Sequence, residues 1–136
     1  MSNQLYPSFV DRCLTTPGGN LLTGTVKAAL VDTALYSFNA THDFYNDVIA
    51  GVVGTPVTLS GKSVVNRVFD AADISFVGLS GAPSLEALIL FLDVGGANSG
   101  WPLIAYIDTA AGLPVAGGAS QVDVSWDNGV NKIFRM

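Results

Sequence analysis

The sequence predicts a mainly β fold, an antiparallel β-sandwich of jelly-roll type, with one or two short helices in the N-terminal third. Three observations predict it. Helical spacing of apolar residues occurs only before residue 50. From residue 54 onward, short apolar stretches alternate with turns rich in Gly, Asp and Asn. No tandem repeat and no long polar linker divides the 136 residues, so we expect one domain, with residues 1–20 as an N-terminal arm and short helix.

An anchor followed by the first short helix is expected over residues 5–14. Pro7 suits a first helical turn. The apolar residues that follow fall together at helical spacing: Phe9, Val10, Cys13 and Leu14. A Pro-Gly-Gly-Asn sequence at residues 17–20 then ends the helix.

A strand and a second short helix follow. Residues 25–31 are almost entirely apolar or β-branched and predict a strand. Thr41 is expected to cap a helix over residues 43–49. In that helix Phe44 and Val48, four residues apart, share a buried face.

The second half of the chain predicts strands throughout. Residues 85–92 are nearly all apolar, which is typical of a central strand covered on both faces. Residues 103–107 return as its antiparallel partner, and Val122, Val124 and Trp126 alternate with polar residues. The other predicted strands span residues 57–59, 63–69, 74–79 and 132–136, and an Asp-Asn-Gly turn at residues 127–129 precedes the last of them.

The charge composition favours association and argues against two classes of partner. Only 12% of residues are charged, about half of the ~25% of an average soluble domain, so little charge opposes contact with another protein. The net charge of −5 and the scattering of the six basic residues argue against a nucleic-acid partner. The longest apolar run has six residues, 87–92, far fewer than the ~20 that span a bilayer. A single cysteine and a start without signal-peptide features predict folding in a cytoplasm.

No residue pattern predicts catalysis, a cofactor or a metal. His42 has no nucleophile near it in sequence, and Cys13 is expected to be a small core residue. The aspartates at predicted strand ends are ordinary turn residues and lack the spacing of a calcium loop. Trp126 continues an apolar face and is expected in the core, whereas Trp101 lies in a Gly-rich loop and is the better candidate for an exposed binding aromatic.

Seven segments, taken in order, resemble a family of small virion proteins of tailed bacteriophages. They are LYPSF (5–9), VKAALVD (26–32), THDF (41–44), VFDAADISF (68–76), LIAYID (103–108), VSWDNG (124–129) and IFRM (133–136). The resemblance extends over nearly the whole chain and includes no catalytic residue. It implies a capsid cement or decoration protein with a jelly-roll-like sandwich, bound on the outside of the capsid.

The partners implied are the major capsid protein and further copies of the chain, as a dimer or trimer. Alternatives are a tail or head–tail connector component and a module that binds a glycan or protein on the host surface, for which Trp101 is the residue to test. The candidate contacts lie at the two ends of the chain, although these ends would also serve simply to close the sandwich. They are Leu5, Tyr6 and Phe9, then Phe134, Arg135 and Met136.

Overall fold

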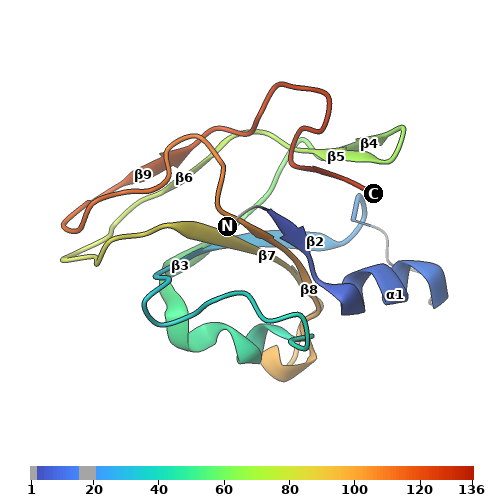
Figure 1. The fold of residues 1–136 in the computed structure, drawn as a ribbon, viewed down its shortest axis with the longest axis horizontal. Coiled ribbons are helices and arrows are strands. Elements are labelled where there is room, and N and C mark those ends of the chain that lie inside the picture. The colour runs from blue at the N-terminus through green and yellow to red at the C-terminus, as the bar shows by residue number, and fades with distance from the viewer. Residues whose placement is uncertain (1–2, 16–20) are drawn as a thin grey trace.

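The longest apolar strands pair into one five-stranded sheet. The computed structural model describes residues 3–15 and 21–136. The strand order in this sheet is β1 (Gln4–Leu5), β8 (Leu103–Ile107), β7 (Ala87–Asp93), β2 (Thr25–Val31) and β3 (Val52–Thr58) (Figure 1). Every neighbouring pair is antiparallel. The predicted central position of residues 85–92 is therefore confirmed, as is the pairing of β7 with residues 103–107.

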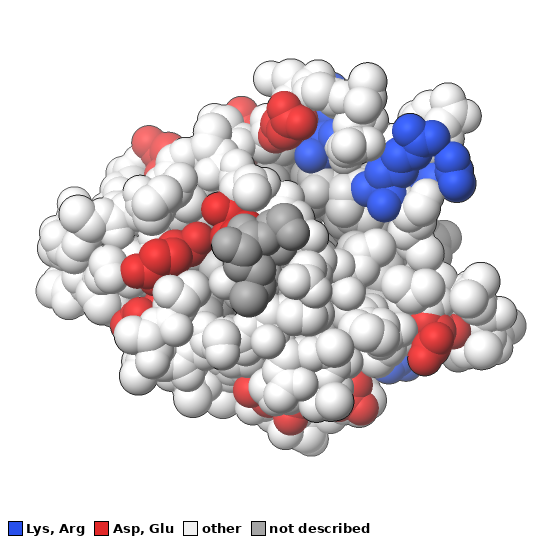
Figure 2. All heavy atoms as spheres, in the orientation of Figure 1, with Lys and Arg blue, Asp and Glu red and all other residues white. Residues whose placement is uncertain are grey.

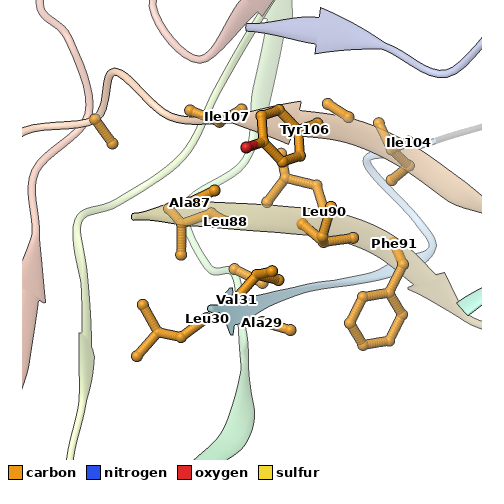
Figure 3. Packing of buried hydrophobic residues seen from close by; sticks show 14 of the residues in the cluster. Ala29, Leu30, Val31, Ala87, Leu88, Leu90, Phe91, Ile104, Tyr106 and Ile107 are labelled. Atoms are coloured by element: carbon orange, nitrogen blue, oxygen red, sulfur yellow. The ribbon is translucent and has the colours of Figure 1, made fainter. Parts of the chain in front are cut away.

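Both faces of this sheet are buried. Cross-strand partners share a face, so Leu90 lies beside Ala28 and Ala105, and Ile89 lies on the opposite face beside Ala29 and Tyr106. All six of these residues are buried, and Figure 3 shows the interior side chains that β2, β7 and β8 contribute. The large sheet is thus a middle layer with packing on each side.

Two small sheets lie over one face of the large sheet (Figure 1). One has the order β10 (Phe134–Arg135), β5 (Val68–Asp70), β4 (Ser63–Val65), and the other pairs β6 (Ile74–Phe76) with β9 (Val122–Val124). Every strand pairing within residues 3–15 and 21–136 is antiparallel. The predicted mainly β, antiparallel fold is confirmed, and the two layers of strands are compatible with the expected sandwich.

The segment between β2 and β3 lies on the other face. Tyr45 stacks on Phe91 with ring centroids 4.1 Å apart, and Phe38 meets Tyr106 edge-on at 5.9 Å. Instead of the second α-helix expected over residues 43–49, the chain forms two 3₁₀ turns, η1 (Tyr45–Asp47) and η2 (Ile49–Gly51). The Asp47 carboxylate accepts hydrogen bonds from the Asp43 and Phe44 N–H groups, so it forms a local turn that competes with an α-helix.

The first helix is confirmed as α1 (Pro7–Thr15), and Val122, Val124 and Trp126 are buried as predicted. The helix stop expected at residues 17–20 lies outside the described residues. Leu14 is 78% exposed rather than packed on the buried face of the helix. A further short helix, η3 (Asn98–Gly100), lies between β7 and β8.

The single strand predicted over residues 63–69 is wrong, because the chain turns back within it. β4 and β5 form a hairpin around Asn66 and Arg67, whose φ angles are +51° and +69°. Two-residue hairpin turns of this kind favour Asn followed by Gly, since both residues need positive φ. Arg67 stands where Gly is preferred, so the usual sequence pattern of the turn is absent.

We predict that Leu90→Ala lowers the free energy of unfolding by about 2–5 kcal/mol. Leu90 is fully buried in the middle strand of the large sheet, and its truncation removes apolar contacts and leaves a cavity between two layers. Urea denaturation followed by circular dichroism measures the change. The matched control is Leu35→Ala, at a side chain that is 64% exposed, and a loss of equal size in both variants would contradict the layered core.

We also predict that Arg67→Gly raises the free energy of unfolding by about 0.5–1 kcal/mol. A left-handed backbone conformation costs an L-residue ~1–2 kcal/mol, and part of this gain is offset by the larger entropy that Gly loses on folding. Urea denaturation followed by circular dichroism measures this change in the free energy of unfolding. A lower stability of the Gly variant would show that the Arg67 side chain contributes more than its backbone conformation costs.

Candidate interaction surface

Two of the predicted contact residues are buried and form part of the core. Tyr6 is 0% and Phe9 is 1% exposed, so their side chains are closed to a partner in this structure. The Tyr6 and Tyr36 hydroxyl oxygens lie 2.7 Å apart, and Tyr36 in turn lies 3.2 Å from His42 Nδ1. Burial and the contact with Tyr36 raise the pKa of Tyr6. Tyr6 and Phe9 therefore close the fold, which was the alternative interpretation of the chain ends.

Trp101 is half-buried rather than free in its loop. Its ring stacks on Phe91 at 5.8 Å and on Tyr45 at 5.7 Å, and its Nε1–H donates to the Gly95 carbonyl. The Lys27 ammonium lies 6.0 Å from the ring centroid, and the same ammonium donates to Asp93 at 2.8 Å. The hydrogen bonds from Lys27 and from the Gly95 N–H hold the pKa of Asp93 below its ordinary value. These contacts of Trp101 are all within the chain and hold its ring against the large sheet.

The C-terminal candidates lie at the surface together with Leu5. Leu5 and Phe134 are half-buried, and Arg135 and Met136 are exposed. All four border one hollow of about 600 Å³ between the edge of the large sheet and the C-terminal segment. The structure therefore gathers these four predicted residues and separates them from Trp101, which borders none of the hollows described here.

An apolar groove of about 540 Å³ runs between α1, the β4–β5 hairpin and the C-terminal residues. Leu14, Leu22, Val64 and Met136 expose much of their side chains there. Its base is aromatic, since Phe134 contacts both Phe9 and Phe69. We call this set the apolar groove: Phe9, Cys13, Leu14, Leu21, Leu22, Val64, Arg67, Phe69, Phe134 and Met136.

A third hollow, of about 440 Å³, lies beside the same hairpin. We call it the basic hollow, and its lining consists of Ser63, Val65, Asn66, Val68, Asp70, Gly129, Val130, Lys132 and Arg135. With Lys62 and Arg67, four of the six basic residues of the chain belong to this small sheet or the residues next to it. Figure 2 shows blue atoms gathered at this end, with most red atoms spread over the remainder of the visible face.

The sequence predicts the C-terminal part of this surface but not Leu14, Leu22 and Val64. The missed residues are apolar, as core residues are, and their exposure depends on how the hairpin lies relative to α1. The one available signal was the low charge content, which indicated an exposed contact surface without giving its position.

Within the described ranges, no group of three or more His, Cys, Asp or Glu residues is arranged to hold a metal ion. In the same residues, no helix is long and apolar enough to cross a membrane. His42 borders the Tyr36 ring and hydroxyl. Cys13 is half-buried at the apolar groove.

We predict slow alkylation of Cys13. Burial raises the pKa of its thiol above the ordinary value of 9.0, and the nearby Arg12 charge offsets only part of that effect. Since the thiolate is the nucleophile, iodoacetamide should react severalfold more slowly than with free cysteine at pH 8, and the difference should narrow above pH 9. Mass spectrometry follows the reaction, and the same protein in urea is the control. A rate in the folded protein equal to that in urea would contradict the prediction.

The arrangement as a whole is suited to contact with another macromolecule. The apolar groove would lose water on binding, and the cations around it would attract a partner that carries carboxylates. Comparison with protein-family models, with curated proteins and with solved structures gives no match.

Proposed function

We propose that the chain is a non-enzymatic structural protein of a bacteriophage virion that binds the outside of the assembled capsid and stabilises it. The observation that supports binding is the apolar groove, an exposed and partly aromatic surface on a chain with few charges. The capsid as the partner comes from the resemblance of the seven sequence segments to small virion proteins. Its proposed partners are the major capsid protein and further copies of the chain, as a dimer or trimer, and the chain would fold in the host cytoplasm before it joins the capsid.

Burial of the apolar groove against a capsid would contribute favourable free energy to binding. Covering apolar side chains contributes ~25 cal/mol for each Å² removed from water, and Leu14, Leu22 and Met136 all offer area. A protein that binds the assembled shell and not its free subunits shifts the equilibrium towards the shell. When many copies bind one lattice, even modest contacts act together.

The same surface would serve the alternative readings as a tail or head–tail connector component. Deletion separates these readings, because loss of particle stability points to capsid cement and loss of tail joining points to the connector. A module for the host surface would use Trp101, and the stacking of Trp101 on Phe91 gives that reading less support.

The test of the proposed function is co-sedimentation with assembled capsids, after light scattering has given the mass in solution. We predict that the wild-type chain pellets with capsids and that Leu14→Glu weakens binding at least about tenfold, because a carboxylate then lies in the apolar groove. Leu35→Glu is the matched control, at an exposed leucine outside the three hollows. A wild-type chain that stays in the supernatant would overturn the proposal, and equal binding by both variants would remove the groove from it.

The host-surface reading has its own test. Trp101→Phe keeps an aromatic ring on Phe91 and removes the indole N–H that bonds Gly95. If the chain is a capsid component, we expect unchanged phage adsorption with this variant. A loss of adsorption with normal particle stability would favour the host-surface module instead.

A further inference from the structure

We infer that the edge strand β4 is the docking site within this surface and that it takes an extended, acidic segment of a partner as an added strand. The alternate side chains of that segment would enter the two hollows, an apolar one in the apolar groove and a carboxylate in the basic hollow. The inference deepens the proposed function and rests on it for the identity of the partner, but its chemistry can be tested without capsids.

Within residues 3–15 and 21–136, β4 is an edge strand. It is the last strand in the order β10-β5-β4, so β5 is its one strand neighbour among the described residues. The register pairs Val65 with Val68 across the two-residue turn and Val64 with Phe69. Residues that flank such a turn exchange both hydrogen bonds, so the next pair is not hydrogen-bonded.

The consequence is that the N–H and C=O groups of Val64 point away from β5. The Phe69 carbonyl supports this, because it accepts a hydrogen bond from the Ile133 N–H on the β10 side at 3.1 Å. Val64 itself is exposed. An outward N–H and C=O pair of this kind, flanked by apolar side chains, can pair with an incoming strand.

The two hollows lie on opposite faces of the small sheet. Val64, Phe69 and Phe134 are cross-strand partners and all line the apolar groove. Their sequence neighbours Val65, Val68 and Arg135 are also cross-strand partners, and all line the basic hollow. Because successive side chains of a strand point to opposite faces, a strand added to β4 places alternate side chains in the two hollows.

The charges around β4 favour an acidic partner segment. Lys132 and Arg135 line the basic hollow, opposed by Asp70 alone among its lining residues, and Arg67 lies at the end of the apolar groove. A carboxylate on the added strand would therefore meet cations. A symmetric pair of β4 edges from two copies would instead bring the two sets of cations together, which like-charge repulsion opposes. The occupant is thus an acidic segment rather than a second β4.

The two edges of the large sheet are less suited. The outer strand β3 carries Pro56, which has no N–H to donate to a neighbour and protects an edge. The opposite edge, β1, has only two residues. The turn of the hairpin holds Arg67 at φ +69° where Gly would be less strained, and a strained residue of this kind commonly marks a functional position.

The test is a ¹⁵N NMR titration of the full chain with the acetylated, amidated peptide Val-Glu-Val-Glu-Val. We expect saturable shifts of the Ser63, Val64 and Val65 amides, with protection of the Val64 amide from exchange. The matched peptide Val-Lys-Val-Lys-Val should bind at least about tenfold more weakly, because its ammonium groups would face Lys132 and Arg135. No saturable shift at β4, or equal binding of the two peptides, would overturn the inference.

Two variants separate backbone docking from non-specific contact. Val64→Pro removes the outward N–H at an edge position that tolerates Pro, and should weaken binding about tenfold, whereas Val64→Thr keeps the N–H and should bind within about threefold of wild type. The double variant Lys132→Glu, Arg135→Glu should reverse the preference towards the lysine peptide. Wild-type affinity in Val64→Pro would overturn strand addition even if the chain still pellets with capsids, and peptide binding by a chain that ignores capsids would leave the inference standing while the capsid proposal fails.

Discussion

The architecture depends on the burial of β7 on both faces. Leu88, Leu90 and Phe91 are fully buried, and a strand with six consecutive apolar residues can be stable in water only with a packed layer on each side. The small sheets supply one layer, and the segment between β2 and β3 supplies the other through rings such as Tyr45. Because the first of these layers consists of strands of two or three residues, it contains several short edges. The exposed edge of β4 is a product of that construction.

The parts of the fold that were predictable are those in which local pattern and tertiary packing agree. Residues 25–31 form a strand as predicted, because β-branched and apolar residues there also meet buried neighbours on both sides. The hairpin at Asn66 and Arg67 was missed, since Arg gives no turn signal and its positive φ depends on the pairing of β4 with β5. The prediction of a second α-helix over residues 43–49 is wrong for a similar reason. The Tyr45 N–H bonds the Trp101 carbonyl, and the Leu103 N–H bonds the Asp43 carbonyl, so contacts distant in sequence take groups that a helix would have used.

The candidate surface shows the same division. Phe134, Arg135 and Met136 were selected from the sequence and lie at the surface hollows, but Tyr6 and Phe9 from the same reasoning are core residues. An apolar side chain has the same chemistry in a core and in an interface, and only the positions of neighbouring elements distinguish the two. Leu14 illustrates this, since helical spacing placed it with Phe9 and the structure leaves it exposed in the groove that Phe9 underlies.

The proposed docking would also affect the stability of the chain itself. Among the described residues, the β4–β5 hairpin pairs with one further strand, the two-residue β10, and Val64 and Val65 are exposed on it. Such an element belongs to the less stable part of a fold. A partner strand on β4 would bury these valines, and it would lie over a groove whose base joins Phe9 of α1 to Phe134 of β10. Binding would therefore hold the first helix, the hairpin and the last strand together, so the energy of association would also stabilise the bound fold.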